Sequence, residues 1–387
     1  MTIMVILERL GIKPIINGCG TLTRLGGDRV DPGIIDAMKE VANHFIDMNE
    51  LLVKSGEYVA RLLNVPGALI VNGAGAGIVL AIAAAITEGD IQKMIKLPFT
   101  EGFKNEIIIQ HPHTINNPYV YFAAIPGGKL KIVGSLTKVT KEDIVNAIND
   151  KTAAILHFYF EPQEGEVPLS DVIGIAHKYG VPVIVDAAAE LPPVENLTRF
   201  IRMGADLVIF SGGKDIGAPN DTGLILANNL KLLEACRLMT YVSYVEVNNQ
   251  THVFIGRAMK MSKEDIIAFI AALERYLTMD HNQRLLTMHR KADLIIDELK
   301  KSFPQLKIRK RVNNPNERIR PVVIPKVEIE LPEELTKSLI KSLRESDPPI
   351  YLCECDGHLC INVHTLTDEE VIVVIEKLKE LLAKYLP

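Results

Sequence analysis

The sequence predicts an α/β protein with a mostly parallel β-sheet and a smaller α+β domain. Seven short apolar segments alternate with helical patterns between residues 68 and 226, as strands buried on both faces do. The chain has 387 residues, which exceeds the size of one small domain. Hydrophobic residues make up 48% and charged residues 24%, the composition of an ordinary globular protein.

The large domain is predicted from the order of these segments. Its strands are expected at residues 68–71, 106–110, 130–133, 153–160, 181–185, 206–210 and 223–226. Its main helices are expected at residues 78–86, 144–148, 169–179 and 230–239. Thr140 and Asp143 form a capping signature before the second of these helices. Ligands of such sheets bind beyond the carboxyl ends of the strands, so the residues that follow each strand are the candidates for chemistry.

After about residue 246 the regular alternation of strands and helices ends, and the pattern becomes that of an α+β domain. Helices are expected at residues 263–276, 279–299, 334–344 and 368–385, and strands at 307–312, 321–332 and, as a pair, 350–363. We therefore expect three regions. Residues 1–48 form an N-terminal arm and part of a small domain, residues 49–245 a large ligand-binding domain, and residues 246–387 a small α+β domain.

Composition argues against several classes of protein. Lys and Arg total 43 against 48 Asp and Glu, and this net charge of −5 disfavours a nucleic-acid partner. Glu8 and Arg9 interrupt the first apolar segment, so no secretion signal is expected, and no apolar run is long enough to span a membrane. The cysteines are too few for a disulfide framework, and we expect a cytoplasmic protein. They are Cys19, Cys236, Cys353, Cys355 and Cys360. One-residue spacing between two of them disfavours zinc, and no metal is expected.

A run of small residues follows the first predicted strand. The sequence Asn-Gly-Ala-Gly-Ala-Gly at 72–77 leads into a helix, where backbone N–H groups can approach an anion. The candidates for this contact are Gly73, Ala74, Gly75 and Ala76. The spacing is not that of a dinucleotide-binding loop, and no Lys-Ser/Thr pair follows. A tight turn without a ligand would have the same composition.

Two ionisable residues follow later strands. Asp186 ends an apolar strand, where a buried carboxylate needs a partner such as a protonated ring nitrogen; capping of the next turn is the alternative. Lys214 follows Ser211 and two glycines, and a confined lysine can form a Schiff base, although a surface lysine would fit the same loop. Pyridoxal phosphate carries a phosphate, a pyridine nitrogen and an aldehyde, the groups that this set matches. Ser211 would then help to bind the phosphate.

The sequence resembles the fold-type-I pyridoxal-phosphate enzymes, and within them the selenocysteine synthase-like family. The resemblance is carried by residues 16–26, 73–77, 183–193, 204–214 and 256–264. It is strongest to a short branch that includes D-glucosaminate-6-phosphate ammonia-lyase. The resemblance implies a seven-stranded, aspartate aminotransferase-like sheet, pyridoxal 5′-phosphate as cofactor, and a homodimer or higher oligomer. The family's first motif begins at Asn17, which leaves no room for the family's RNA-binding extension.

The resemblance also implies roles for individual residues. Lys214 and Asp186 are expected to be catalytic together with His113, which stacks on the cofactor ring. Substrate contacts are expected from Asn17, Thr21 and Arg257. Thr114 and His364 stand where the family often has arginines, and this departure leaves the substrate's acidic group without its usual partners.

The expected activity is a lyase that releases ammonia and a 2-keto acid from a small hydroxy-amino acid or amino-sugar acid. An aminotransferase or a racemase would use the same residues. A selenocysteine synthase-like transferase, or a relative that binds tRNA or a protein, is the further alternative.

Overall fold

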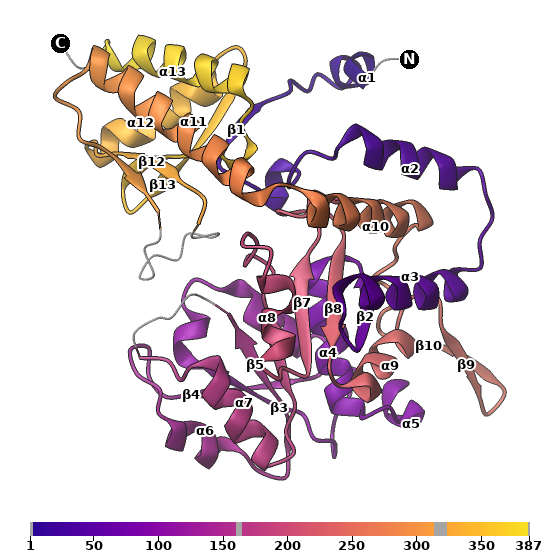
Figure 1. The fold of residues 1–387 in the computed structure, drawn as a ribbon. Helices are drawn as coiled ribbons and strands as arrows, with labels where there is room; N and C mark the ends of the chain where they lie inside the picture. The colour runs from indigo at the N-terminus through magenta and orange to yellow at the C-terminus, as the bar shows by residue number, and fades with distance from the viewer. Residues whose placement is uncertain (1–2, 160–164, 313–322, 386–387) are drawn as a thin grey trace. The chain divides into compact units, whose positions relative to one another are not determined.

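The computed structural model describes residues 3–159, 165–312 and 323–385, which form two compact units. Val30–Thr278 makes up nearly all of the larger unit. Of the described residues, 3–29 join residues 279–312 and 323–385 in the smaller unit (Figure 1). The sequence placed its boundaries at residues 48 and 245, whereas the chain passes between the units at residues 29 and 278. Helix α2 (Pro32–Ala42) belongs to the larger unit because it packs along α10 (Lys263–Thr278).

The larger unit contains a seven-stranded sheet, which confirms the predicted fold class. Its strands are β2 (Gly67–Val71), β3 (Glu106–Gln110), β4 (Lys129–Val133), β5 (Thr152–Phe158), β6 (Val183–Asp186), β7 (Leu207–Ser211) and β8 (Gly223–Ala227). Their order is β2-β8-β7-β6-β5-β3-β4. Strand β8 runs antiparallel to both neighbours, and the other described pairs are parallel. Residue 160, the last residue of the strand predicted at 153–160, lies outside the described residues.

Helices of the larger unit pack against this sheet or against one another. They are α3 (Met48–Leu63), α4 (Gly73–Thr87), α5 (Ile91–Met94), α6 (Lys141–Ala147), α7 (Leu169–Lys178), α8 (Asn196–Arg202), α9 (Leu230–Leu238), α2 and α10. Short 3-10 turns η2 (His111–Thr114) and η3 (Pro118–Ala124) follow β3, and β9 (Tyr244–Val247) pairs with β10 (Gln250–Val253). The capping box between Thr140 and Asp143 is present at the start of α6, as predicted.

Helix α4 is largely buried, because its sequence consists mostly of Ala, Ile, Leu, Val and Gly. All its side chains from Gly77 to Thr87 are buried. A Cβ atom added at Gly77 would lie 2.8 Å from a methyl carbon of Ile209 on β7, so the helix lies tightly against the sheet. This packing fixes the position of the helix N-terminus at the carboxyl ends of the strands.

The smaller unit is an α+β structure, as predicted. Its sheet has the order β1 (Ile16–Gly18), β13 (Ile350–Cys355), β14 (His358–Asn362), β12 (Lys326–Ile329) and β11 (Ile308–Arg311). Its helices are α1 (Ile3–Arg9), η1 (Thr23–Leu25), α11 (His281–Ser302), α12 (Glu333–Arg344), η4 (Val363–Thr365) and α13 (Asp368–Leu382). Residues 321–322 of one predicted strand lie outside the described residues.

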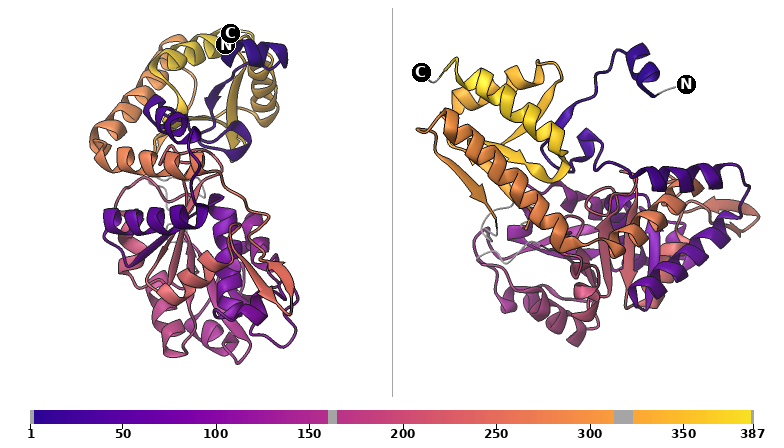
Figure 2. Two further views of the ribbon diagram at one scale, coloured as in Figure 1. Left: turned by 90° about the vertical axis from the view of Figure 1, so that its right-hand side faces the viewer. Right: turned by 45° about the horizontal axis from the view of Figure 1, so that its top comes forward.

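The two faces of this smaller sheet differ in chemistry. Alternate residues along a strand point to opposite faces. One face is apolar and packs with α11, α12 and α13, which lie together in two views (Figure 2); its residues include Ile350, Leu352, Leu359, Ile361, Val327 and Ile329. The other face carries polar side chains and cysteines.

Across the described chain, no helix is both long and apolar enough to cross a membrane.

Candidate active site

Asp186 and Lys214 come together at one edge of the larger sheet. Strands β6 and β7 are parallel neighbours, with Asp186 opposite Ile209, so the residues after both strands lie at the same edge. Both ionisable side chains are only partly exposed and interact electrostatically. Burial raises the pKa of Asp186, and a hydrogen bond from the Ala188 N–H and the charge of Lys214 oppose this shift. Burial lowers the pKa of Lys214, and the charge of Asp186 opposes that shift.

Glu190 is a third ionisable group beside this pair, and sequence reasoning missed it. Its residue is 5% exposed, and its negative charge raises the pKa of Lys214 against the effect of burial. The Asn196 side chain donates a hydrogen bond of 2.7 Å to the Glu190 carbonyl, which helps to fix this segment. Lys214 therefore lies near two carboxylates. The signal in the sequence was that Glu190 comes shortly after Asp186, the last residue of β6.

The turn that carries Lys214 requires its two glycines. A Cβ atom at Gly212 would lie 2.2 Å from the Thr222 hydroxyl oxygen, and one at Gly213 would lie 2.4 Å from the Asn220 Cα. The buried Tyr276 hydroxyl donates a hydrogen bond of 2.6 Å to Asp215, directly after the lysine. This bond joins the turn to α10. The sequence contained no signal for it, because the two partners are 61 residues apart.

The N-terminus of α4 has no side-chain cap. Asn72 occupies the N-cap position, but its side chain makes no capping bond; it donates instead to the Lys260 carbonyl at 2.7 Å. Residues Gly73–Ala76 are partly exposed. The first N–H groups of the helix are thus not capped by a side chain, and the helix dipole favours negative charge there.

Close backbone packing holds this loop next to β8 and β7. Gly73 has a φ of +72°, and a Cβ atom at Gly223 would lie 2.5 Å from the Gly73 carbonyl carbon. Gly223 is in turn the register partner of Ser211 at the end of β7. The predicted phosphate-binding residues are therefore brought together. A Cβ atom at Gly75 would also lie 2.6 Å from the Phe122 ring.

His113 follows β3 in turn η2 and is completely buried. Its Nε2 atom lies 2.9 Å from a Glu166 carboxylate oxygen, and its ring meets the His157 ring edge-on with centroids 4.5 Å apart. Burial, followed by the nearby His113, lowers the pKa of His157 to about 3, so His157 is neutral. His157 lies in β5 and is 1% exposed. Glu166 was not predicted.

Thr114 and Arg257 are the two remaining candidate residues of the larger unit. The Thr114 hydroxyl donates a hydrogen bond of 2.8 Å to the His111 carbonyl, so it closes its own turn. Arg257 is exposed, and its role in substrate binding stays a prediction.

A cavity of about 640 Å³ lies at the amino-terminal ends of the strands, and its lining contains none of the predicted site residues.

Asn17 and Thr21 belong to the smaller unit. The Asn17 side chain donates to the Gly20 carbonyl and accepts from the Cys19 N–H, each at 2.9 Å, so its amide closes a local turn. The Thr365 hydroxyl donates to the Asn17 carbonyl at 2.5 Å. Thr21 is partly exposed in the same arm. The substrate roles of both residues stay predictions.

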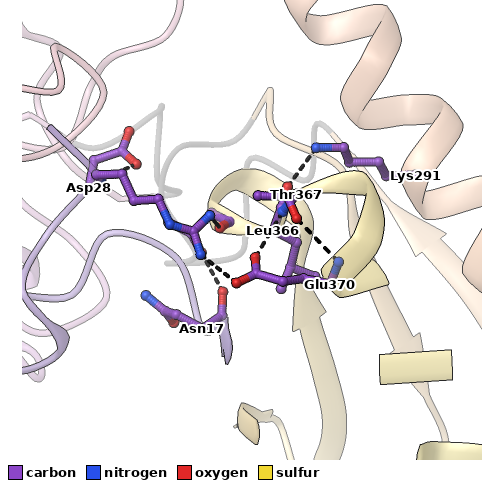
Figure 3. Close-up of polar contacts among 8 residues, drawn as sticks. Asn17, Asp28, Lys291, Leu366, Thr367 and Glu370 are labelled. Carbon is purple, nitrogen blue, oxygen red and sulfur yellow. Dashed lines mark hydrogen bonds and ion pairs between the residues drawn. The ribbon is translucent and has the colours of Figure 1, made fainter. Parts of the chain in front are cut away.

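Polar contacts fasten this arm to the start of α13 (Figure 3). Arg29 donates to the Glu370 carboxylate at 2.5 Å and to the Thr365 carbonyl at 3.0 Å. Glu370 and Thr367 form a capping box, and Lys291 donates to the Leu366 carbonyl at 2.5 Å (Figure 3).

His364 has an arginine beside it from another element. The Arg284 Nη2 atom on α11 lies 3.0 Å from His364 Nε2, and the histidine side chain is 1% exposed. A guanidinium group is therefore present near the position where the family often has its own arginine. The sequence could not indicate this, because 80 residues separate the two.

Comparisons with known proteins agree with this geometry. A family model described as the DegT/DnrJ/EryC1/StrS aminotransferase family matches residues 132–347. The chain is 34% identical over 275 residues to D-glucosaminate-6-phosphate ammonia lyase of Salmonella typhimurium, covering 70% of each chain. The chain belongs to the selenocysteine synthase-like family of fold-type-I pyridoxal-phosphate enzymes.

Other similar proteins cover more of the chain. A solved structure of D-glucosaminate-6-phosphate ammonia-lyase matches 98% of both chains with a TM-score of 0.80 and 27% identity. The 5′-C-glycyluridine monooxygenase-decarboxylase of a Streptomyces species is 29% identical over 385 residues, covering 97% of this chain and 91% of its own. The L-seryl-tRNA(Sec) selenium transferase of Aquifex aeolicus is 25% identical over 421 residues, covering 97% and 86%.

The residues present fit pyridoxal phosphate, the cofactor of this family. A helix N-terminus without a side-chain cap suits its phosphate. Burial raises the pKa of Asp186, and a protonated ring nitrogen beside it would stabilise its carboxylate form. Burial lowers the pKa of Lys214, which favours the nucleophilic amine. Among the described residues, no group of three or more His, Cys, Asp or Glu side chains is arranged to hold a metal ion.

Proposed function

We propose that this protein is a pyridoxal-phosphate-dependent lyase that releases ammonia and a 2-keto acid from an amino-sugar acid or a small hydroxy-amino acid. The observation that carries the proposal is the electrostatic interaction between Lys214 and Asp186, at the edge of the sheet where α4 begins. Similarity to D-glucosaminate-6-phosphate ammonia-lyase along almost the whole chain supports the reaction class.

Each residue has a defined task in this proposal. Bound pyridoxal phosphate supplies an electron sink conjugated with the substrate α-carbon. The Gly73–Ala76 N–H groups and Ser211 bind its phosphate. Asp186, as a carboxylate, keeps the ring nitrogen protonated. The Lys214 amine, whose pKa is lowered by burial, takes the α-proton at Nζ. The substrate then loses its β-hydroxyl as water, and hydrolysis of the resulting enamine gives the 2-keto acid and ammonia.

A substrate screen tests the proposal. Purified protein with added pyridoxal phosphate is incubated with D-glucosaminate 6-phosphate, D-glucosaminate and small hydroxy-amino acids, and ammonia and 2-keto acid are measured together. We expect equal amounts of both products from at least one substrate. Lys214→Ala should abolish release and the borohydride-reducible cofactor adduct. The matched control, Lys231→Ala, removes an exposed lysine and should change neither.

The same assay separates the alternatives. An aminotransferase gives a keto acid without ammonia and only with an added amino-group acceptor. A racemase changes optical rotation without either product. Oxygen uptake with release of carbon dioxide would instead match the monooxygenase-decarboxylase relative. Any of these results, without ammonia release, would exclude the lyase.

Partner binding is tested separately. We propose a homodimer or higher oligomer, as the family resemblance implies, and light scattering of the purified protein measures it. The transferase alternative requires tRNA binding with a steep dependence on salt. With a net charge of −5, we expect no such binding.

A further inference from the structure

Four of the five cysteines gather on the polar face of the smaller sheet. Cys19, directly after β1, forms a disulfide with Cys353 on β13. Cys353 lies opposite Cys360 of β14, and Cys355 lies opposite His358. Because opposite residues and alternate residues share a face, Cys353, Cys355 and Cys360 lie on the same side. The sequence did not predict this disulfide, since its two cysteines are 334 residues apart.

The disulfide occupies two of these sulfur atoms and leaves a pair of thiols beside them. Cys355 and Cys360 are free cysteines that form a side-chain hydrogen bond with each other. They are diagonal neighbours across the hairpin formed by β13 and β14. This pairing places one thiol within reach of the other next to the two-residue turn at Asp356 and Gly357.

The two thiols have different surroundings. Cys360 is 2% exposed, whereas Cys355 is partly exposed. The hydrogen bond from Cys360 is the main cause that lowers the pKa of Cys355; Lys326 and Arg311 add to it, and burial opposes it. The same hydrogen bond, followed by burial, raises the pKa of Cys360. Cys355 is thus the more accessible of the two thiols and the one with the lowered pKa, whereas Cys360 is buried beside it.

We propose that Cys355 and Cys360 form a thiol–disulfide exchange site for low-molecular-weight disulfides, in which Cys355 attacks and Cys360 resolves. A reactive, accessible cysteine beside a second thiol is the arrangement of redox-responsive pairs. The site is independent of the proposed lyase activity, because it uses none of the residues assigned to that reaction.

The chemistry balances in two steps. The Cys355 thiolate attacks one sulfur of the small disulfide, the disulfide bond breaks, and one small thiolate leaves and takes a proton from water. Cys360 then attacks the Cys355 sulfur, the mixed bond breaks, and the second small thiolate leaves with the Cys360 proton. The small disulfide is reduced to two thiols, and the protein gains a Cys355–Cys360 disulfide.

Closing that bond requires a small movement at the end of the hairpin. Diagonal cross-strand neighbours ordinarily stand about 7–8 Å apart, and disulfides need Cα atoms within about 7 Å. Asp356 and Gly357 have φ angles of +52° and +82°, the conformation of a tight hairpin turn. Because the two cysteines flank this turn at the end of the sheet, only a short segment has to shift.

The test uses the full-length protein and oxidised glutathione, with intact mass and peptide mapping as readouts. Wild type should lose two hydrogens and keep no glutathione, because Cys360 displaces it. Cys360→Ser should accumulate one glutathione, mapped to Cys355. Cys355→Ser and Cys355→Ala should show neither change. Cys236→Ser is the control, since that thiol is buried and burial raises its pKa.

Several outcomes would overturn the proposal. One is a wild type that reacts no faster than Cys355→Ala. Another is glutathione attached to Cys236 or Cys360 while Cys355 stays free. A third is native protein in which Cys19 and Cys353 are both free thiols and the cluster retains a zinc ion. None of these readouts depends on ammonia release, so failure here and failure of the lyase assay are distinguishable.

Discussion

Substituting Gly223 by alanine tests how the anion-binding loop is held. The added Cβ would lie 2.5 Å from the Gly73 carbonyl carbon and 2.9 Å from the Ala74 nitrogen. Carbon atoms pack at about 3.5–4.0 Å, so the loop must move by about 1 Å. Both neighbours are backbone atoms, which cannot swing away as a flexible side chain does. Overpacking of this kind costs about 1–3 kcal/mol of stability.

The same shift should weaken cofactor binding. A movement of about 1 Å breaks at least one N–H bond to the cofactor phosphate, and bonds to charged groups contribute about 1.5–3 kcal/mol. Since about 1.4 kcal/mol corresponds to tenfold in affinity, the Kd for pyridoxal phosphate should rise about tenfold to a hundredfold. Titration followed by the visible absorbance of the bound cofactor measures this change, and urea unfolding measures stability.

Gly174→Ala is the matched control. Gly174 lies within α7, and a Cβ atom there has nothing within 4 Å. Because alanine favours helix over glycine, this variant should gain about 0.5–1 kcal/mol and keep its cofactor affinity. If Gly223→Ala binds pyridoxal phosphate as tightly as Gly174→Ala, close packing at Gly223 does not position the loop.

Three further predictions concern buried polar contacts. Tyr276→Phe removes the hydrogen bond to Asp215 and should cost about 1.5–3 kcal/mol in urea unfolding, because the acceptor is a buried carboxylate. His157 has a pKa of about 3 in the folded protein and an ordinary value of 6.5, so unfolding takes up a proton between these values. Stability should therefore fall as pH falls through this window, and His157→Gln should flatten the slope by about 1.4 kcal/mol per pH unit. Arg284→Ala, beside His364, should raise KM for acidic substrates about tenfold or more with little change in kcat, if the guanidinium binds the substrate's anionic group.

Each of these predictions has its own control. Tyr179→Phe alters an exposed tyrosine and should leave unfolding unchanged. His252→Gln alters a partly exposed histidine and should leave the acid slope unchanged. Arg290→Ala removes an exposed arginine from the same helix as Arg284 and should leave KM unchanged. A variant that behaves like its control contradicts the role assigned to the substituted residue.

Local pattern was sufficient to predict the fold class and part of the candidate site. Short apolar segments separated by helices indicate parallel strands, and all seven predicted strands are present in the larger sheet. Because the carboxyl ends of parallel strands share one edge, the sequence predicts that Asp186 and Lys214 lie at the same edge of the sheet. The capping box at Thr140 was predictable from local sequence alone, since its two residues are only three apart.

Tertiary structure decided the contacts that depend on long-range register. Tyr276 reaches Asp215 from a helix 61 residues away, and Arg284 reaches His364 across 80 residues. Cys19 meets Cys353 because β1 joins the edge of a sheet that the opposite end of the chain builds. Sequence patterns report the faces and ends of single elements. They do not contain the pairing of distant elements, which is set by how the whole apolar surface is buried.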